Sequence, residues 1–303
     1  MTNTENVFKF IDTYAESAES LYLEAIIEAC NKWITGDETP ELSEDISKEE
    51  IRRGIQLAVL KGMKQNAQPH HQMTPDSIGL LIGHIAGRLV DGEEDITLFD
   101  PAVGTGNLLY TVMNAIGKDV TASAVEIDEL LVRLSAVIAE LLEHPVTLLV
   151  QDALRPLLVD PVDITISDLP VGYYPDDDNG SNYELMPSEG HAYAHHLFIE
   201  QSINHTKPGG YGIFIVPANL FESEQTAKLH PFLKEKTIIR AIIQLPKSLF
   251  QNKAHEKSIL ILQKPFLEQK SSPDVLLAQV PDMKDKQAMA RFLQEIDQWA
   301  AEK

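Results

Sequence analysis

The fold is decided by the stretch Leu98-Phe99-Asp100-Pro101-Ala102-Val103-Gly104-Thr105-Gly106-Asn107-Leu108-Leu109. An apolar run, Ile96–Phe99, ends in the acid Asp100, and a glycine turn then leads into a helix-like segment. This order is typical of α/β proteins, in which ligands bind outside the carboxyl ends of parallel strands. Glycines at 104 and 106 let a ligand approach the backbone closely, so we expect a side chain at Gly106 to fill the cleft. A tight turn without a ligand is the alternative interpretation.

The same stretch argues against two phosphate-binding motifs. A dinucleotide-binding loop has the pattern G-x-G-x-x-G, and here Leu109 stands at the third glycine. A P-loop is excluded because no G-K-[ST] follows. An acid before the glycines instead suits a cationic amino group.

The next two strand-like runs also end in acids. Val120–Val125 is followed by Glu126, 26 positions after Asp100, and Thr147–Val150 is followed by Gln151 and Asp152. A carboxylate at the second position can accept hydrogen bonds from both hydroxyls of a ribose, and Asp152 could accept one from the amino group of adenine. Three acids at successive strand ends oppose a pyrophosphate, and they favour S-adenosylmethionine over NAD as the cofactor.

The rest of the chain divides into a helical part and an alternating part. Apolar residues at helical spacing predict helices at about 5–33 and 47–63, with Ser47 and Glu50 forming a capping box at the start of the second. From about residue 74, helices alternate with apolar runs, the later ones being Asp163–Ile166, Gly212–Val216, Ile238–Ile243 and Ser258–Leu262. We therefore expect a helical domain at 1–70, a seven-stranded Rossmann-like α/β domain at 71–270 and an extension at 271–303 that ends in a helix. The short connection before the last run favours an antiparallel final strand.

Composition limits the possible functions. The 303 residues include 46 acidic and 25 basic side chains, a net charge of −21, and a single cysteine, Cys30. One cysteine excludes a disulfide framework and fits a reducing cytoplasm, where we place the protein. The acidic surface opposes tight nonspecific binding of nucleic acid by the whole protein. Only residues 228–264 are locally basic, with eight basic and two acidic residues, and they form either a solvated face or a contact surface for an anionic substrate.

The glycine loop resembles motif I of the N6-adenine DNA methyltransferases, and most closely that of the modification subunits of type I restriction systems. Collinear blocks extend the resemblance over about residues 70–265: Met73-Thr74-Pro75, Glu126-Ile127, Asp152-Ala153, Lys207–Gly212, Ile242–Pro246 and Lys257–Leu262. The resemblance implies S-adenosylmethionine as cofactor. We expect no metal site, because the acidic cluster at 176–178 lacks the D-x-D-x-D-G spacing of a calcium-binding loop. The resemblance also implies a set of cofactor-binding residues: Met73, Thr74, Asp100, Pro101, Ala102, Gly104, Gly106, Asn107, Glu126, Ile127, Asp152 and Ala153.

The catalytic motif departs from the family pattern. Members carry [NDS]-P-P-[FYW] after the fourth strand, where the polar side chain and a backbone carbonyl bind the adenine amino group and the aromatic ring stacks on the flipped base. Here the stretch reads Ser167-Asp168-Leu169-Pro170-Val171-Gly172-Tyr173-Tyr174. Asp168 and Pro170 align, Leu169 replaces a proline, and Val171 replaces the stacking aromatic residue. The resemblance implies that Asp168, the Leu169 carbonyl and Pro170 form the acceptor site, with Tyr173 or Tyr174 supplying the ring. The alternative is a degenerate site that keeps only fold and cofactor.

Three functions follow from these observations. The first is an N6-adenine DNA methyltransferase, the second a non-catalytic cofactor-binding module or assembly partner, and the third a methyltransferase acting on a protein or a small molecule. DNA would enter weakly across the sheet edge near Lys247, Lys253 and Lys257, or with the help of a basic partner or specificity subunit.

Overall fold

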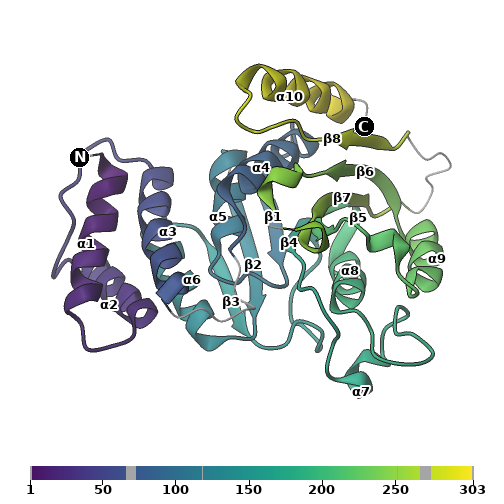
Figure 1. The fold of residues 1–303 in the computed structure, drawn as a ribbon, viewed down its shortest axis with the longest axis horizontal. Coiled ribbons are helices and arrows are strands. Elements are labelled where there is room, and N and C mark those ends of the chain that lie inside the picture. Colours follow the sequence, from purple (N-terminus) through teal and green to yellow (C-terminus); the bar gives the residue numbers. More distant parts are fainter. Residues whose placement is uncertain (1, 66–72, 118, 251, 267–273, 302–303) are drawn as a thin grey trace.

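The protein contains a single mixed sheet with helices on both faces, and the N-terminal part of the chain forms a helical bundle beside it (Figure 1). The computed structural model describes residues 2–65, 73–117, 119–250, 252–266 and 274–301. The expected domain boundaries at residues 70 and 270 lie outside these ranges. The strands are β1 Ile96–Asp100, β2 Val120–Glu126, β3 Val146–Val150, β4 Val162–Asp168, β5 Thr206–Pro217, β6 Ile238–Gln244, β7 Lys257–Gln263 and β8 Leu276–Gln279.

The strand order is β3-β2-β1-β4-β5-β7-β6-β8. The order reverses between β1 and β4, which creates the switch point where ligands bind in such sheets. β7 is antiparallel to both of its neighbours, as the short connection before it predicts. An eighth strand, β8, pairs with β6 and forms one edge of the sheet, so the sheet has one strand more than the seven expected from the sequence.

Ten α-helices are described: α1 Asn3–Ser17, α2 Tyr22–Thr35, α3 Lys48–Gln65, α4 Asp76–Leu89, α5 Asn107–Ile116, α6 Glu129–Leu141, α7 Asp177–Gly180, α8 Ala194–Asn204, α9 Thr226–Lys236 and α10 Lys286–Ala301. The capping box at the start of α3 is confirmed, because the Glu50 amide donates to Ser47 Oγ at 3.2 Å and the Ser47 amide donates to Glu50 Oε2 at 3.0 Å. Among the described helices, none is long and apolar enough to cross a membrane.

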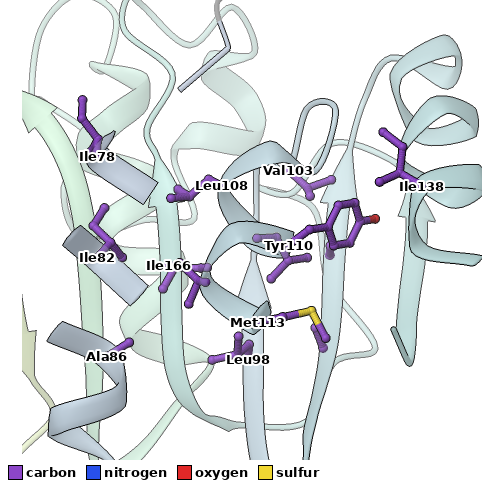
Figure 2. Close-up of a cluster of buried hydrophobic side chains, with 14 of the residues drawn as sticks. Ile78, Ile82, Ala86, Leu98, Val103, Leu108, Tyr110, Met113, Ile138 and Ile166 are labelled. Atoms are coloured by element: carbon purple, nitrogen blue, oxygen red, sulfur yellow. The ribbon is translucent and has the colours of Figure 1, made fainter. Parts of the chain in front are cut away.

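Buried strands with apolar side chains on both faces divide the core into two layers. Along β5, Ile213 and Ile215 pack with α4 and α5 on one face, whereas Phe214 and Val216 pack with α8 and α9 on the other. The two-residue period of a strand produces this alternation. In the first layer, Tyr110 and Met113 of α5 belong to the same core cluster as Leu98 of β1 and Ile78 of α4 (Figure 2). The helix that follows the glycine loop therefore packs against the sheet.

The helices α1–α3 form a bundle that contacts the rest of the protein through α2 and α3. α3 packs against α1, α2 and α5, and α2 packs against α6 (Figure 1). The bundle therefore touches the helix that begins at the glycine loop.

Candidate active site

Four charged residues meet on the side of the sheet where the parallel strands end, which we call the site edge. Asp100, Glu126 and Asp168 are the last residues of the parallel strands β1, β2 and β4, so they lie at the same edge. Lys257 is the first residue of β7, and because that strand runs in the opposite direction its beginning reaches this edge too. The topology thus brings together three acids and one lysine that are far apart in the sequence.

The two glycines of the loop have different roles. Gly104 has a φ of +55°, and a Cβ built there would meet nothing within 4 Å, which leaves open space beside the backbone. Gly106 has a φ of +81°, but its Cβ would lie 2.1 Å from the Tyr110 ring and 2.8 Å from the Ser135 hydroxyl. The expectation that a side chain at Gly106 fills the ligand cleft is therefore wrong, because that position faces the packed interior. Gly104 is the glycine that borders open space.

Asp100 is a buried carboxylate in the floor of the site. Its Oδ1 accepts hydrogen bonds from the Ala102 amide at 3.0 Å and from Ser167 Oγ at 2.9 Å. Burial, with smaller contributions from Glu126 and Asp168, raises the pKa of Asp100 to about 7. Pro101 is also buried. A cation bound here would therefore favour the ionised form of Asp100.

Glu126 links the glycine loop to the second strand. Its Oε2 accepts from the Gly104 amide at 3.0 Å, and its Oε1 accepts from the Ile127 amide at 2.8 Å and the Asp128 amide at 3.0 Å. Each carboxylate oxygen has two lone pairs, so Oε1 is fully used and one acceptor position on Oε2 remains for a ribose hydroxyl. The Ile127 side chain is 71% exposed, which leaves an apolar surface beside this carboxylate.

Asp152 lies in a hydrogen-bonded group with Tyr174. The Tyr174 hydroxyl donates to Asp152 Oδ2 at 2.5 Å, and Asn179 donates to that hydroxyl at 2.9 Å. Burial and the bond to Asp152 raise the pKa of Tyr174 to about 12. Ala153 is buried next to Asp152. Tyr174 is thus fixed in the wall around Asp152, and it is not an open stacking surface.

Asp168 has a charged partner that sequence reasoning missed. Lys257 Nζ donates to its Oδ1 at 2.6 Å, and Thr74 Oγ1 donates to its Oδ2 at 2.9 Å. The next residue, Leu169, is buried, and its amide donates to the Ile215 carbonyl of β5 at 3.1 Å, while Pro170 is half-buried. The loop is therefore anchored on both sides of the Asp168 carboxylate.

Tyr173 is the exposed aromatic residue nearest to this loop in sequence. Its side chain is 61% exposed, and its ring stacks on Tyr193 with centroids 5.0 Å apart and planes 12° from parallel. A β-bridge joins the two residues, and the Ala194 amide donates to the Gly172 carbonyl at 2.8 Å. The Tyr173 ring is therefore held in place with one face covered.

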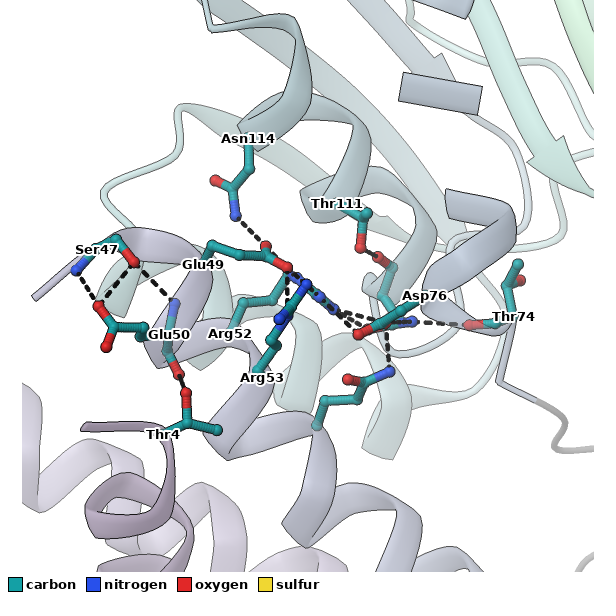
Figure 3. A network of polar contacts seen from close by, with 12 residues as sticks. Thr4, Ser47, Glu49, Glu50, Arg52, Arg53, Thr74, Asp76, Thr111 and Asn114 are labelled. Carbon is teal, nitrogen blue, oxygen red and sulfur yellow. Dashed lines mark hydrogen bonds and ion pairs between the residues drawn. The ribbon is translucent and has the colours of Figure 1, made fainter. Parts of the chain in front are cut away.

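A buried polar network connects the N-terminal bundle to the site (Figure 3). Arg52 of α3 is 2% exposed and donates to both carboxylate oxygens of Glu49 and of Asp76. It also donates to Asn107 Oδ1 at 2.6 Å, and Asn107 Nδ2 in turn donates to the Thr74 carbonyl at 2.8 Å. The Asn107 side chain thus joins Arg52 to Thr74, and Thr74 joins Asp168.

The remaining residues predicted for the site or for DNA binding are Met73, Lys247 and Lys253. Met73 precedes Thr74, and its half-buried side chain packs against the main core cluster. Lys247 and Lys253 are exposed on the two short turns between β6 and β7, Lys247–Leu249 and Lys253–His255. Lys257 differs from these two lysines, because it is paired with Asp168 inside the site.

The comparisons with known proteins agree with this geometry. Residues 62–298 match the model of the N-6 DNA methylase family, and residues 5–63 match that of the YtxK N-terminal helical domain. The chain therefore belongs to the N-6 DNA methylase family. It is 43% identical over 308 residues to the uncharacterized protein YtxK of Bacillus subtilis (strain 168), covering 99% of this chain and 93% of that protein.

Solved structures show the same architecture. A candidate class I S-adenosylmethionine-dependent methyltransferase from Listeria monocytogenes is 42% identical, with a TM-score of 0.89 over 98% of this chain and 99% of that one. A type I modification subunit from Vibrio vulnificus YJ016 is 17% identical, with a TM-score of 0.65 over 84% of this chain and 59% of that one. The fold is that of the methyltransferases, as the resemblance of the glycine loop implies.

Proposed function

We propose that the protein transfers a methyl group from S-adenosylmethionine to a neutral amino group, with adenine N6 in DNA as the leading acceptor. The observation that carries this proposal is the position of Asp168. This carboxylate ends β4, directly beside the strand whose glycine loop offers open space at Gly104. The glycine loop proposed for the cofactor and the carboxylate proposed for the acceptor thus lie at the ends of neighbouring strands.

The residues at this edge fit S-adenosylmethionine. Open space at Gly104 would admit the cofactor, Asp100 would attract its positive charge, and Glu126 Oε2 would accept from a ribose hydroxyl. The exposed Ile127 side chain and the Asp152 carboxylate would border the adenine ring. When bound, the cofactor supplies a methyl group on a sulfonium, which an in-line acceptor can take without a covalent enzyme intermediate.

The chain's own contribution is to bind and orient the acceptor. Asp168 and the Leu169 carbonyl would accept hydrogen bonds from the acceptor amino group and direct its lone pair, while Pro170 shapes the turn. Thr74 and Lys257 hold the carboxylate in position. Such positioning accounts for much of the rate that a site without a covalent nucleophile can supply.

Tyr173 can supply the aromatic ring that is missing from the motif because Val171 stands at its position. Its side chain is 61% exposed, with Tyr193 stacked on the ring and His191 beside it at a centroid distance of 6.2 Å, so a base could pack on the exposed part of the ring. Stacking of one base on an aromatic side chain contributes about 1–3 kcal/mol. This arrangement favours adenine over an acceptor without a ring.

A methyl-transfer screen tests the proposal. Labelled S-adenosylmethionine is incubated with the protein and DNA, RNA or a cell extract, and labelled products are identified chemically. N6-methyladenine in DNA supports the leading acceptor, and Asp168→Asn should reduce the label at least about tenfold. A labelled glutamine side chain or small molecule would instead identify a methyltransferase of proteins or small molecules, because the same loop could bind a neutral amide. Binding of the cofactor without any labelled product would support the non-catalytic module.

DNA binding is expected to be weak and to use Lys247 and Lys253, with a basic partner or specificity subunit supplying the remaining charge. Both side chains are exposed, whereas Lys257 is paired with Asp168. Each phosphate contact contributes about 0.9 to the slope of log affinity against log salt for duplex DNA. Lys247→Glu with Lys253→Glu should therefore lower that slope by about 1.8 in a fluorescence-anisotropy titration. An unchanged slope would show that DNA enters elsewhere.

A further inference from the structure

The acceptor side of the site contains a full positive charge. Lys257 Nζ lies 2.6 Å from Asp168 Oδ1, and the two side chains are each 20% exposed. Lys257 reaches Asp168 across the end of β5, since Pro217 at that end pairs with Lys257. The pair therefore joins two strands that are not neighbours in the sheet, and it lies inside the site.

The surroundings of this pair are acidic. The end residues of β1, β2 and β4 are Asp100, Glu126 and Asp168, and the first residue of β7 is Lys257. Asp100 and Glu126 would together attract a cation such as the sulfonium of S-adenosylmethionine. The third acid, Asp168, is already compensated by Lys257.

We propose that Lys257 determines which class of acceptor the site takes. By compensating the charge of Asp168, it suits the site to a neutral amino group attached to a ring or a carbonyl, and it excludes aliphatic ammonium groups. This inference rests on the proposed function, because it assumes that the acceptor binds against Asp168 beside the cofactor.

The physical basis is the balance of charges around the acceptor. A neutral amino group can donate to lone pairs that Asp168 retains, since an ionised carboxylate has about four acceptor positions. An ammonium group would lie close to both the Lys257 ammonium and the sulfonium, while Asp168, the carboxylate against which the acceptor binds, is already compensated by Lys257. Like charges a few ångströms apart in a partly buried site repel strongly. Without Lys257, Asp168 would become an uncompensated carboxylate that attracts an ammonium group.

Two ligands of different charge test this directly without any methyl acceptor. Sinefungin carries an ammonium group at the position of the transferable methyl, whereas S-adenosylhomocysteine has no charge there. Calorimetry gives the ratio of their affinities for the parent and for Lys257→Met. We expect the variant to shift this ratio toward sinefungin at least about tenfold, since one full charge close to the ammonium is removed.

Control variants separate this role from a purely structural one. Lys257→Arg keeps the charge and should retain the parent ratio, and Lys234→Met removes an exposed lysine of α9 and should leave the ratio unchanged. Lys257→Gln provides a second neutral variant should the methionine variant fail to fold, as judged by circular dichroism. A ratio that stays constant in both neutral variants, with both ligands bound, would overturn the inference and leave the proposed function intact. Failure of the parent to bind either ligand would overturn the proposed cofactor site itself, and the inference with it.

Discussion

Replacing Arg52 with methionine should strongly destabilise the protein. The guanidinium of Arg52 is 2% exposed and forms paired hydrogen bonds with two carboxylates, Glu49 and Asp76, at 2.8–3.1 Å. Removal of one partner from a buried ion pair costs about 3–5 kcal/mol, because the remaining charge is left uncompensated. We therefore expect Arg52→Met to lower the free energy of unfolding by about 3–5 kcal/mol in a urea titration followed by circular dichroism.

The neighbouring Arg53 is the matched control. It is also paired with Glu49, but its side chain is 47% exposed and the structure shows one such bond, at 2.8 Å. An exposed pair of this kind contributes about 0–1 kcal/mol, so Arg53→Met should change stability by no more than that. Equal losses in the two variants would refute the reasoning, since burial and pairing would then not decide the cost.

The Arg52 effect should also depend on pH. Burial alone would raise the pKa of Glu49, but hydrogen bonds from Arg52 outweigh this and lower it below the ordinary value of 4.5. A carboxylate with a lowered pKa stabilises the fold above its unfolded pKa and loses that contribution as pH falls. The difference between parent and Arg52→Met should therefore be full above pH 4.5 and shrink in more acidic buffer.

Three further predictions concern the floor and the loop of the site. Burial raises the pKa of Asp100 from 3.8 to about 7, so ionisation opposes folding and the free energy of unfolding should fall as pH rises through that interval. Asp100→Asn should flatten this dependence in urea titrations at several pH values, and an unflattened curve would assign it to another group. Gly104→Leu should lower S-adenosylmethionine affinity at least about tenfold at a strain cost of about 1–2 kcal/mol, because it fills open space at a positive φ. Gly106→Ala should instead lower stability, since its Cβ would meet Tyr110 at 2.1 Å, and a well-folded variant that loses only cofactor affinity would contradict this.

The glycine loop and the strand-end acids could be predicted because they depend on local sequence. A strand that ends in Asp100 and turns through Gly104 into a helix is written in consecutive residues, and the acids Glu126 and Asp152 follow the next strands in the same way. The antiparallel β7 was also predictable, from the short connection before it. These features needed only the patterns of strands, turns and helices.

Features that depend on distant contacts could not be predicted. Lys257 and Asp168 are 89 positions apart, and only the reversed direction of β7 brings them together. Arg52 resembles a surface residue of an amphipathic helix until α5 and Asp76 cover it. β8 was missed because it has four residues and alternates between half-buried and exposed positions at the sheet edge, which gives a weak apolar signal. The sequence likewise could not show that Gly106 faces the interior, because Tyr110 of α5 and Ser135 of α6 lie beside it only in the folded protein.

Calorimetry with S-adenosylmethionine and NAD tests the central claim most directly. The strand-end acids predict that S-adenosylmethionine binds and NAD does not. Glu126→Ala should weaken cofactor binding by about 1.5–3 kcal/mol, as expected for loss of hydrogen bonds to a charged group. Tight binding of NAD together with no response to S-adenosylmethionine would contradict the assignment of this edge as a methyltransferase cofactor site.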